Sequence, residues 1–212
     1  MTKEFKEASP NNIHQVVGVD FGVNFIATTY DSKGETFFHR GRHIKDKRAQ
    51  YSKVRKSLQQ RGTPSSRRRL KAIGQKENRW MTDVNHQVSK ALVDKYGKNT
   101  LFVLEDLTGI RNTTKKVRKS NKYVYVSWAF YQLRQMIEYK SQINESIAIV
   151  VDPRYSSQTC PKCGHTHKDN RNKKKHIFCC QNCRYTSNDD RIAAMNLQQK
   201  GIEYIVEVTT TV

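Results

Sequence analysis

Residues 160–196 read CPKCGHTHKDNRNKKKHIFCCQNCRYTSNDDRIAAMN and contain the Cys-x-x-Cys pattern twice. Cys160 and Cys163 form the first pattern, Cys180 and Cys183 the second, and sixteen residues separate the two. This spacing is typical of four-thiolate zinc sites, and soft thiolate ligands favour zinc. The pattern therefore predicts a zinc ribbon over residues 155–187, in which these four cysteines hold a structural Zn²⁺.

Other arrangements of these cysteines stay open. Two disulfides or four unrelated cysteines are the main alternative, but nothing in the chain indicates an oxidising compartment. Cys179 is left over, because only Cys180 with Cys183 restores a two-residue gap. A histidine could also replace one thiolate, and the candidates are His165, His167 and His176.

A helix is predicted directly after the second cysteine pattern. Asn188 or the following aspartate can cap it by accepting its free first-turn N–H groups. Asp190 would then be carried into the protein, where a carboxylate needs a metal or a cation. The alternative is that Asp190 only decorates the first turn, stabilised by the helix dipole. The face that holds Asp190 also holds the small or apolar residues Ala193, Ala194 and Leu197.

The 212-residue chain is strongly basic, with 39 Lys and Arg against 19 Asp and Glu and a formal charge of +20. Such a balance suits a polyanion, and nucleic acid is the natural candidate. A membrane surface is the competitor, but no long apolar run or basic amphipathic anchor stands out. The polar start shows no signal peptide. We therefore expect a cytoplasmic, nucleoid-associated protein without a membrane partner.

The first half of the chain predicts strands followed by helices. Residues 14–20 read as a buried strand ending at Asp20, and residues 25–30 and 35–40 as two more strands of an antiparallel meander. Apolar residues keep helical spacing through residues 41–97. This helical part is also dense in lysine and arginine.

The basic residues predict contacts with phosphate. A charge run is by default a solvated face, but one this one-sided favours a phosphate backbone. Residues 111–122 are polar, basic and without periodicity, and we expect them to order on nucleic acid. The predicted nucleic-acid contacts are Lys53, Arg55, Arg67, Arg68, Arg69, Lys116, Arg118 and Arg154.

The second half of the chain predicts two more strands and another helix. The apolar run in residues 99–107 reads as a strand that ends at Glu105 and Asp106, and residues 147–151 as a strand leading into the ribbon. Between them, Ser127 can cap a helix whose apolar stripe belongs to the core. Residues 202–212 form a tail, expected as a short strand or as disorder.

Three carboxylates stand at the ends of core elements, namely Asp20, Glu105 and Asp190. The order of three strands, helices, strand, helix, strand and helix is that of the ribonuclease H fold, in which carboxylates at these places converge. Three hard oxygen ligands suit Mg²⁺ or Mn²⁺, and two such ions promote in-line attack on a phosphodiester. The expected fold is α/β, a ribonuclease H-like mixed sheet with helices and an inserted four-cysteine ribbon.

Four motifs carry a family resemblance: GVDFG with Asp20, LEDLTGIR with Glu105, VDPRYSSQTCPKCG, and FCCQNCRYTSNDDRIAAMNL with Asp190. Together they resemble the RuvC-like nuclease portion of the TnpB (OrfB) family, transposon-encoded RNA-guided DNA endonucleases related to compact type V CRISPR effectors. The resemblance covers roughly residues 15–200. It implies that the three acids bind the catalytic metal and that the ribbon binds the target nucleic acid. DNA and a guide RNA are the implied partners.

This resemblance divides the chain into a leader at 1–14, the nuclease core at 15–154 and 188–201, the ribbon at 155–187, and a tail. Ile192 replaces an asparagine that is common in the family. Only about nineteen residues precede Asp20, where family members carry a recognition region. We therefore expect this chain to be a fragment, to use a separate recognition subunit or second copy, or to use its guide differently.

The favoured hypothesis is a metal-dependent DNA endonuclease acting in an RNA-guided transposon or CRISPR-like complex. The alternative is a catalytically silent nucleic-acid-binding subunit or guided repressor. A small regulator built around the ribbon and a strand-joining transposase of the DDE type rank behind both.

Overall fold

The computed structural model describes residues 8–22, 24–107 and 130–210. A five-stranded mixed sheet with the strand order β3-β2-β1-β4-β5 forms its centre. β1 runs antiparallel to β2 and parallel to β4, β2 runs antiparallel to β3, and β4 runs parallel to β5. The predicted mixed α/β fold is thus confirmed. The strands are β1 Gln15–Asp20, β2 Phe25–Tyr30, β3 Thr36–Arg40, β4 Thr100–Glu105 and β5 Ile147–Val151.

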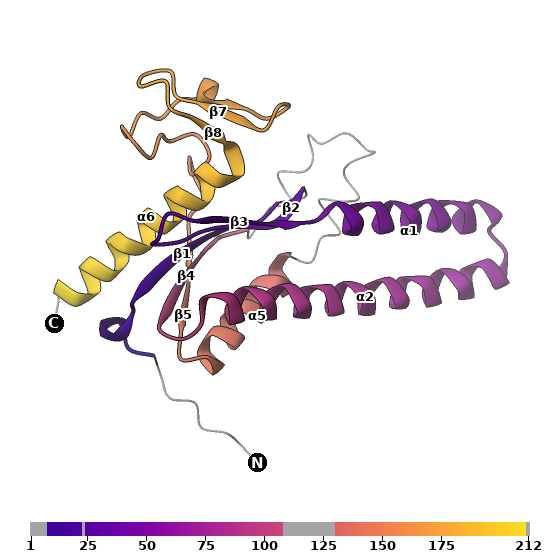
Figure 1. Ribbon diagram of the computed structural model, residues 1–212. Coiled ribbons are helices and arrows are strands. Elements are labelled where there is room, and N and C mark those ends of the chain that lie inside the picture. Colours follow the sequence, from indigo (N-terminus) through magenta and orange to yellow (C-terminus); the bar gives the residue numbers. More distant parts are fainter. Residues whose placement is uncertain (1–7, 23, 108–129, 211–212) are drawn as a thin grey trace, which may run out of the picture.

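Successive residues of a strand point to opposite faces of the sheet, so the central strands contribute side chains to two separate hydrophobic cores. Val17 and Val19 of β1 join a core with helices α2 (Pro64–Tyr96) and α5 (Phe130–Ile143). Val16 instead packs with Leu197 of α6 (Asp189–Thr210). The helices therefore cover both faces of the sheet (Figure 1).

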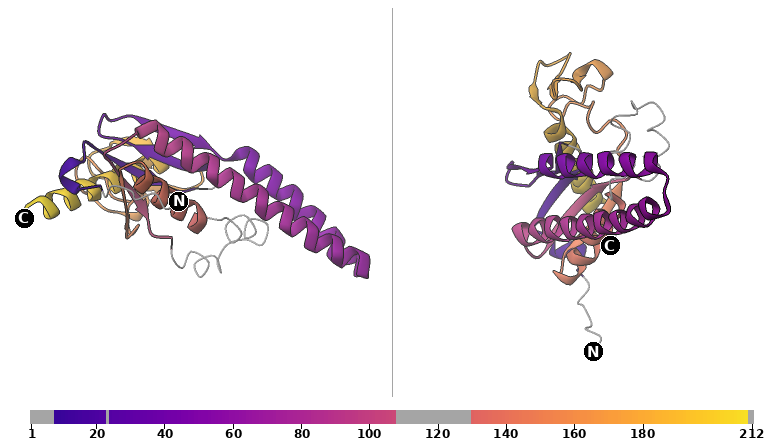
Figure 2. Two further views of the ribbon diagram at one scale, coloured as in Figure 1. Left: turned by 90° about the horizontal axis from the view of Figure 1, so that it is seen from below. Right: turned by 90° about the vertical axis from the view of Figure 1, so that its right-hand side faces the viewer.

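Helix α1 (Arg42–Arg61) and the first half of α2 form an arm that reaches beyond the sheet (Figures 1 and 2). We call residues 42–80 the helical arm. The turn between the helices uses Gly62 in the left-handed conformation and Thr63, whose side chain caps α2 by accepting from the backbone N–H of Ser66. Within the arm the buried Glu77 carboxylate lies 2.8 Å from Arg55 and 3.5 Å from Arg48.

Helix α5 confirms the predicted apolar stripe. Its residues Phe130, Leu133, Met136 and Ile137 are buried. The predicted cap at Ser127 and the basic segment 111–122, with Lys116 and Arg118, lie outside the described residues. In the ranges that the structure describes, no helix has both the length and the apolar character needed to cross a membrane.

The tail prediction is wrong for the residues that the structure describes. Helix α6 does not end near Gly201 but continues to Thr210. Gly201 lies so close to the sheet that an added Cβ would meet Val103 and, at 2.7 Å, Val16. It serves close packing rather than helix termination, and the following Tyr204 and Ile205 still pack against the sheet.

The ribbon is a small separate sheet inserted between β5 and α6. Its strands are β6 Arg171–Asn172, β7 Ile177–Cys179 and β8 Thr186–Asn188, paired antiparallel in the order β6-β7-β8. This sheet stands next to the first turns of α6 (Figure 1). Its buried Phe178 shares a cluster with Ile192 of that helix, so the ribbon is packed against α6.

Candidate functional site

Asp20 and Glu105 meet at one edge of the sheet because β1 and β4 are neighbouring parallel strands. Val19 pairs with Leu104, so the next residue of each strand reaches the same edge. The backbone N–H of Phe21 donates to Glu105 Oε1 at 3.0 Å. Both carboxylates are buried, with 9% and 7% of the residue exposed. The neighbouring Asp106 lies 3.3 Å from Arg134.

Asp190 reaches this edge from the first turn of α6. Asn188 caps the helix, because its Oδ1 accepts from the backbone N–H groups of Asp190 and Arg191 at 3.0 and 3.1 Å. The helix lies close to β1 because Gly18 has no side chain: a Cβ there would sit 2.5 Å from the backbone nitrogen of Gln198. The sequence prediction that Asp190 points inward is confirmed, since the residue is only 9% exposed.

Burial raises the pKa of all three carboxylates, and charges within the triad raise it further at Asp20 and Glu105. Burial raises the pKa of Asp20 well above its ordinary value, and the charges of Glu105 and Asp190 raise it further. Burial raises the pKa of Glu105 to about 7, against the hydrogen bond from Phe21, which lowers it. Burial and the charge of Asp189 raise the pKa of Asp190. Buried oxygen ligands that repel each other are a fitting donor set for a hard divalent cation.

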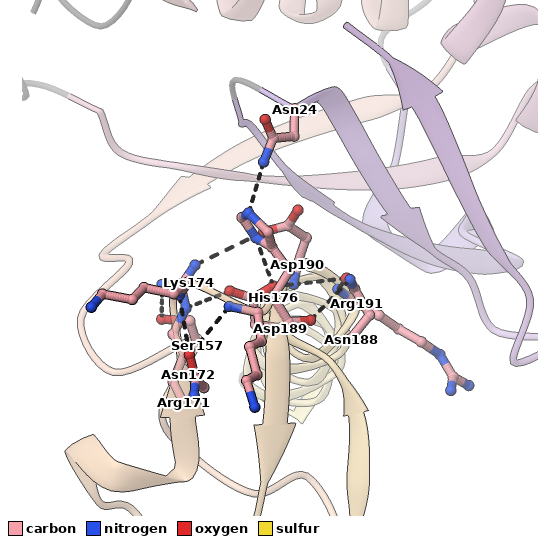
Figure 3. Close-up of polar contacts among 11 residues, drawn as sticks. Asn24, Ser157, Arg171, Asn172, Lys174, His176, Asn188, Asp189, Asp190 and Arg191 are labelled. Carbon is pink, nitrogen blue, oxygen red and sulfur yellow. Dashed lines mark hydrogen bonds and ion pairs between the residues drawn. The ribbon is translucent and has the colours of Figure 1, made fainter. Parts of the chain in front are cut away.

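An arginine of the ribbon also enters this cluster. Arg171 Nε lies 2.8 Å from Asp189 Oδ2, and its Nη2 lies 3.9 Å from Asp190 Oδ1 (Figure 3). Ser157 holds the guanidinium from the other side, accepting from Nη1 at 2.8 Å. Asp189 is fully buried, so Arg171 supplies the positive charge that such a carboxylate needs.

His176 of the ribbon completes the surroundings of the site. Its Nδ1 lies 3.4 Å from Asp189 Oδ1, and its Nε2 lies 2.8 Å from Asn24 Nδ2 (Figure 3). The ligand atoms of His176, Asp189 and Asp190 lie within 4.8 Å of one another. Among the described residues, Asp20 and Glu105 do not belong to such a tight group, so the predicted triad is a wider arrangement than a closed set of ligands.

The sequence alone indicates no role for Arg171 and offers His176 only as a possible zinc ligand. No periodicity singles either of them out, because β6 and β7 are two and three residues long. The available signal was chemical: Arg171 and three histidines, His176 among them, lie between the two cysteine patterns and precede the pair Asp189–Asp190.

The four predicted cysteines come together. The sulfur atoms of Cys160, Cys163, Cys180 and Cys183 lie within 4.8 Å of one another, with Cys160 3.5 Å from Cys183 and Cys163 3.6 Å from Cys180. A tetrahedral zinc ion with ~2.3 Å bonds would place its sulfurs about 3.8 Å apart. All the cysteines are free thiols, which excludes the disulfide alternative in this structure.

The two cysteine turns have the same backbone geometry. The N–H groups of Gly164 and Arg184 donate to the carbonyls of Cys160 and Cys180 at 2.9 and 3.0 Å. Both residues are left-handed, with φ angles of 73° and 61°. Each turn therefore presents its two sulfurs in the same way, as a shared metal requires.

Cys179, His165 and His167 lie outside this thiol cluster, so no histidine replaces a thiolate there. Burial raises the pKa of Cys160 to about 12, whereas the N–H of His165 lowers the pKa of Cys163 to about 6.

The predicted basic contacts differ in what surrounds them. Lys53 and the three arginines at 67–69 are exposed on the helical arm. Arg55 instead forms the ion pair with Glu77 inside the arm. Arg154 is 82% exposed and lies 3.3 Å from Asp152.

A mixed α/β sheet with buried carboxylates at one edge and a four-cysteine ribbon beside them defines a protein with two candidate metal sites. Two family models match the chain: the OrfB_IS605 model, described as a probable transposase, over residues 2–116, and the Cas12f1-like TNB domain over residues 130–197. The first match covers more than half of the chain. The protein therefore belongs to this family of OrfB-type probable transposases, which confirms the resemblance seen in the sequence.

Individual relatives agree with this assignment. The CRISPR-associated endodeoxyribonuclease Cas12f1 of Sulfoacidibacillus thermotolerans is 29% identical over 210 residues, which cover 92% of this chain and 48% of the relative. The TnpB-like protein MJ0751 of Methanocaldococcus jannaschii is 27% identical over 204 residues, 92% of this chain and 72% of that protein.

The solved structures show the same fold. The cryo-EM structure of a Cas12f1–sgRNA–target DNA complex superposes with a TM-score of 0.70 at 18% identity, covering 92% of this chain and 52% of that one. The chain thus spans about half the length of the Cas12f1 relative and of the protein in that complex.

Proposed function

We propose that this chain is the nuclease portion of an RNA-guided DNA endonuclease and that its sheet is ribonuclease H-like, of the RuvC type. The strand order β3-β2-β1-β4-β5, with one antiparallel half and one parallel half, supports this fold. The observation that carries the proposal is the cluster of Asp20, Glu105 and Asp190. Three buried acids whose pKa values are raised, first of all by burial, have a clear use at one sheet edge as ligands of divalent cations.

Asp20, Glu105 and Asp190 would hold Mg²⁺ or Mn²⁺. When bound, two such ions lower the pKa of an attacking water and stabilise the leaving oxygen of the phosphodiester. Glu105 is oriented for this role by the N–H of Phe21. Arg171 neutralises Asp189 next to the ligands and keeps its guanidinium within 3.9 Å of Asp190.

The ribbon would carry Zn²⁺ on its four cysteines and bind the target nucleic acid beside the acids. The exposed Lys53 and residues 67–69 would contact phosphates along the helical arm, and we keep the same proposal for Arg154, Lys116 and Arg118. Arg55 is a weaker candidate because it is paired with Glu77. We expect the domain boundaries at 15, 155 and 188.

A target DNA and a guide RNA are the proposed partners. They are the partners in the solved Cas12f1 complex, whose fold this chain shares. Because the chain spans about half of that protein, we propose that the recognition part comes from a separate subunit, a second copy or a longer form of the protein. We expect the complex to act in the cytoplasm on nucleoid DNA.

The test is Mg²⁺-dependent cleavage of single-stranded DNA by the full chain, purified together with any RNA that accompanies it. Replacing Asp20 by Asn removes one ligand charge but keeps the size, and we expect at least a ~1,000-fold loss of cleavage with binding unchanged. The matched control is Asp94→Asn, an exposed aspartate on α2. Equal cleavage by the Asp20 variant would overturn the proposal, and binding without any cleavage by the unchanged chain would favour a silent nucleic-acid-binding subunit.

A further inference from the structure

A surface hollow of about 660 Å³ lies where β2 and β3 meet the start of α1. Its volume falls within the ~300–1,000 Å³ that is usual for binding pockets. Phe25 and Arg40 are direct partners across the β2–β3 pair, so their side chains share one side of the sheet. The lining residues are Asn24, Phe25, Arg40, Arg42, Lys45 and Asp46.

The hollow is cationic. Arg40, Arg42 and Lys45 are exposed and face a single acid, Asp46. Across residues 8–22, 24–107 and 130–210, none of these three cations forms an ion pair with a carboxylate. The positive charge is therefore available to an anion from outside the chain.

An aromatic ring borders these cations. Phe25 is half-buried and is held by Phe38, with ring centroids 4.7 Å apart at an angle of 50°. A fixed aromatic ring next to basic side chains is the combination that binds single-stranded nucleic acid, because the base stacks while the cations contact phosphate. A base inside a duplex is already stacked on its neighbours, so the ring favours a single strand.

The second basic hollow of the helical arm lacks this feature. It has a volume of about 330 Å³ and is lined by Lys53, Val54, Ser57, Leu58, Arg61 and Arg69. No aromatic side chain is among them. That hollow suits the phosphate backbone alone, whereas the hollow at Phe25 also suits a base.

The hollow at Phe25 lies next to the carboxylate cluster. Asn24 is part of its lining, and Asn24 also contacts His176 at 2.8 Å. His176 in turn lies 3.4 Å from Asp189, the neighbour of Asp190 (Figure 3). One pair of side chains therefore separates the hollow from the proposed cleavage site.

We infer that this hollow binds a nucleotide of the single strand being cut, adjacent to the scissile phosphodiester. Phe25 contacts the base, and Arg40, Arg42 and Lys45 contact the phosphates on either side of it. The inference rests on the proposed nuclease function and adds to it the part of the chain that aligns the substrate strand. In this arrangement, the contact between Asn24 and His176 lies between the nucleotide site and the acids.

The test measures DNA binding rather than cleavage. The full chain carrying Asp20→Asn is titrated with a short labelled oligothymidylate and with an abasic strand of equal length, with Mg²⁺ present. Phe25→Leu keeps an apolar contact with Phe38 but removes the stacking ring. Because stacking on one base is worth ~1–3 kcal/mol, we expect Phe25→Leu to weaken oligothymidylate binding about 5- to 150-fold and abasic binding less than twofold.

The cations are tested with Arg42→Gln combined with Lys45→Gln. This pair is expected to weaken both strands about equally and to lower the salt dependence of binding by ~1.4 logarithmic units per logarithmic unit of salt. The matched control is Lys33→Gln with Lys90→Gln, which removes the same charge from exposed positions away from the hollow. We expect the control to change affinity less than twofold. Thermal melting of each variant shows whether it is folded.

Two results would overturn the inference: Phe25→Leu weakens both strands equally or neither, or the control pair weakens binding as much as the pair in the hollow. A photoreactive 5-iodouracil strand gives a second measurement, since it should cross-link to the peptide that contains Phe25. If the unchanged chain cleaves DNA but Phe25→Leu has no base-dependent effect, only the inference fails. If Phe25→Leu behaves as expected but no cleavage occurs, the proposed function fails.

Discussion

The backbone N–H of Phe21 donates a hydrogen bond to Glu105 Oε1 at 3.0 Å in the buried space between the ends of β1 and β4. This contact fixes the Glu105 carboxyl beside Asp20 before any ligand is present. The hydrogen bond lowers the pKa of Glu105, but burial outweighs it and raises the pKa to about 7. The site is therefore oriented by the backbone and destabilised by its own charge.

The raised pKa of Glu105 predicts how stability depends on pH without metal. The folded state binds this proton more tightly than the unfolded state, whose ordinary value is 4.5. The contribution is therefore complete below pH ~4.5 and is lost as the pH rises to about 7. Glu105→Gln stays neutral, so at pH 8 in a chelator it should unfold with a free energy higher by on the order of 3 kcal/mol, and at pH 4 with an equal one.

Chemical denaturation at several pH values measures this difference. Glu203→Gln, at an exposed position of α6, serves as the control and should follow the unchanged protein at every pH. Parallel curves for Glu105→Gln and the unchanged protein would show that Glu105 is already ionised in the fold.

Adding a single methyl group at Gly18 should have a large effect on the free energy of unfolding. A Cβ at this position would lie 2.5 Å from the backbone nitrogen of Gln198, and backbone atoms of a packed helix cannot easily yield. Gly18→Ala should therefore lower the free energy of unfolding by at least about 3 kcal/mol. Gly74→Ala in the interior of α2 meets only Arg55 at 3.5 Å and should instead add ~0.5–1 kcal/mol. A neutral Gly18→Ala would mean that α6 is not held this closely against β1.

We expect a strong energetic coupling between Arg171 and Asp189, because they form an ion pair. Asp189 is fully buried, so Arg171→Met would leave a buried charge without its cation and should cost about 3–5 kcal/mol of stability. Adding Asp189→Asn should recover a large part of this loss. A double-mutant cycle by thermal or chemical denaturation measures the coupling, and additive effects of the two substitutions would contradict the ion pair.

We expect removal of zinc to cause local rather than global unfolding. The ribbon is a separate small sheet, whereas the main sheet has its own apolar cores. A chelator should expose the amides of residues 155–188 to hydrogen exchange while β4 stays protected, and DNA affinity should fall. Cys160→Ser should have the same effect and Cys179→Ser, outside the thiol cluster, little effect. Loss of protection throughout β4 would mean that the ribbon is not separable.

The sequence was sufficient to predict the strands with a clear apolar pattern and the thiol cluster with its two Cys-x-x-Cys motifs. The valines of β1 and the continuous apolar run of β4 identified the strands that carry Asp20 and Glu105, and the cysteine spacing identified the thiol cluster. These signals are local, because a strand pattern or a Cys-x-x-Cys turn involves only adjacent residues.

The missed features depend on contacts between distant segments. Arg171 and His176 acquire their roles only when the ribbon folds back on Asp189 and Asn24, and no local pattern encodes that arrangement. The predicted core segment ended at Gly201, whereas α6 continues to Thr210. In the structure Gly201 allows α6 to approach Val16 and Val103.

Guided cleavage tests the central claim most directly. The chain is expressed with its native flanking DNA, the RNA that co-purifies is sequenced, and DNA matching that RNA is incubated with the complex and Mg²⁺. We expect the unchanged complex to cut the matched DNA, leaving 5′-phosphate and 3′-hydroxyl ends, and the Asp190→Asn complex to bind it without cutting. Cleavage at an equal rate by Asp190→Asn, or no cleavage by the unchanged complex with Mg²⁺ or Mn²⁺, would contradict the account.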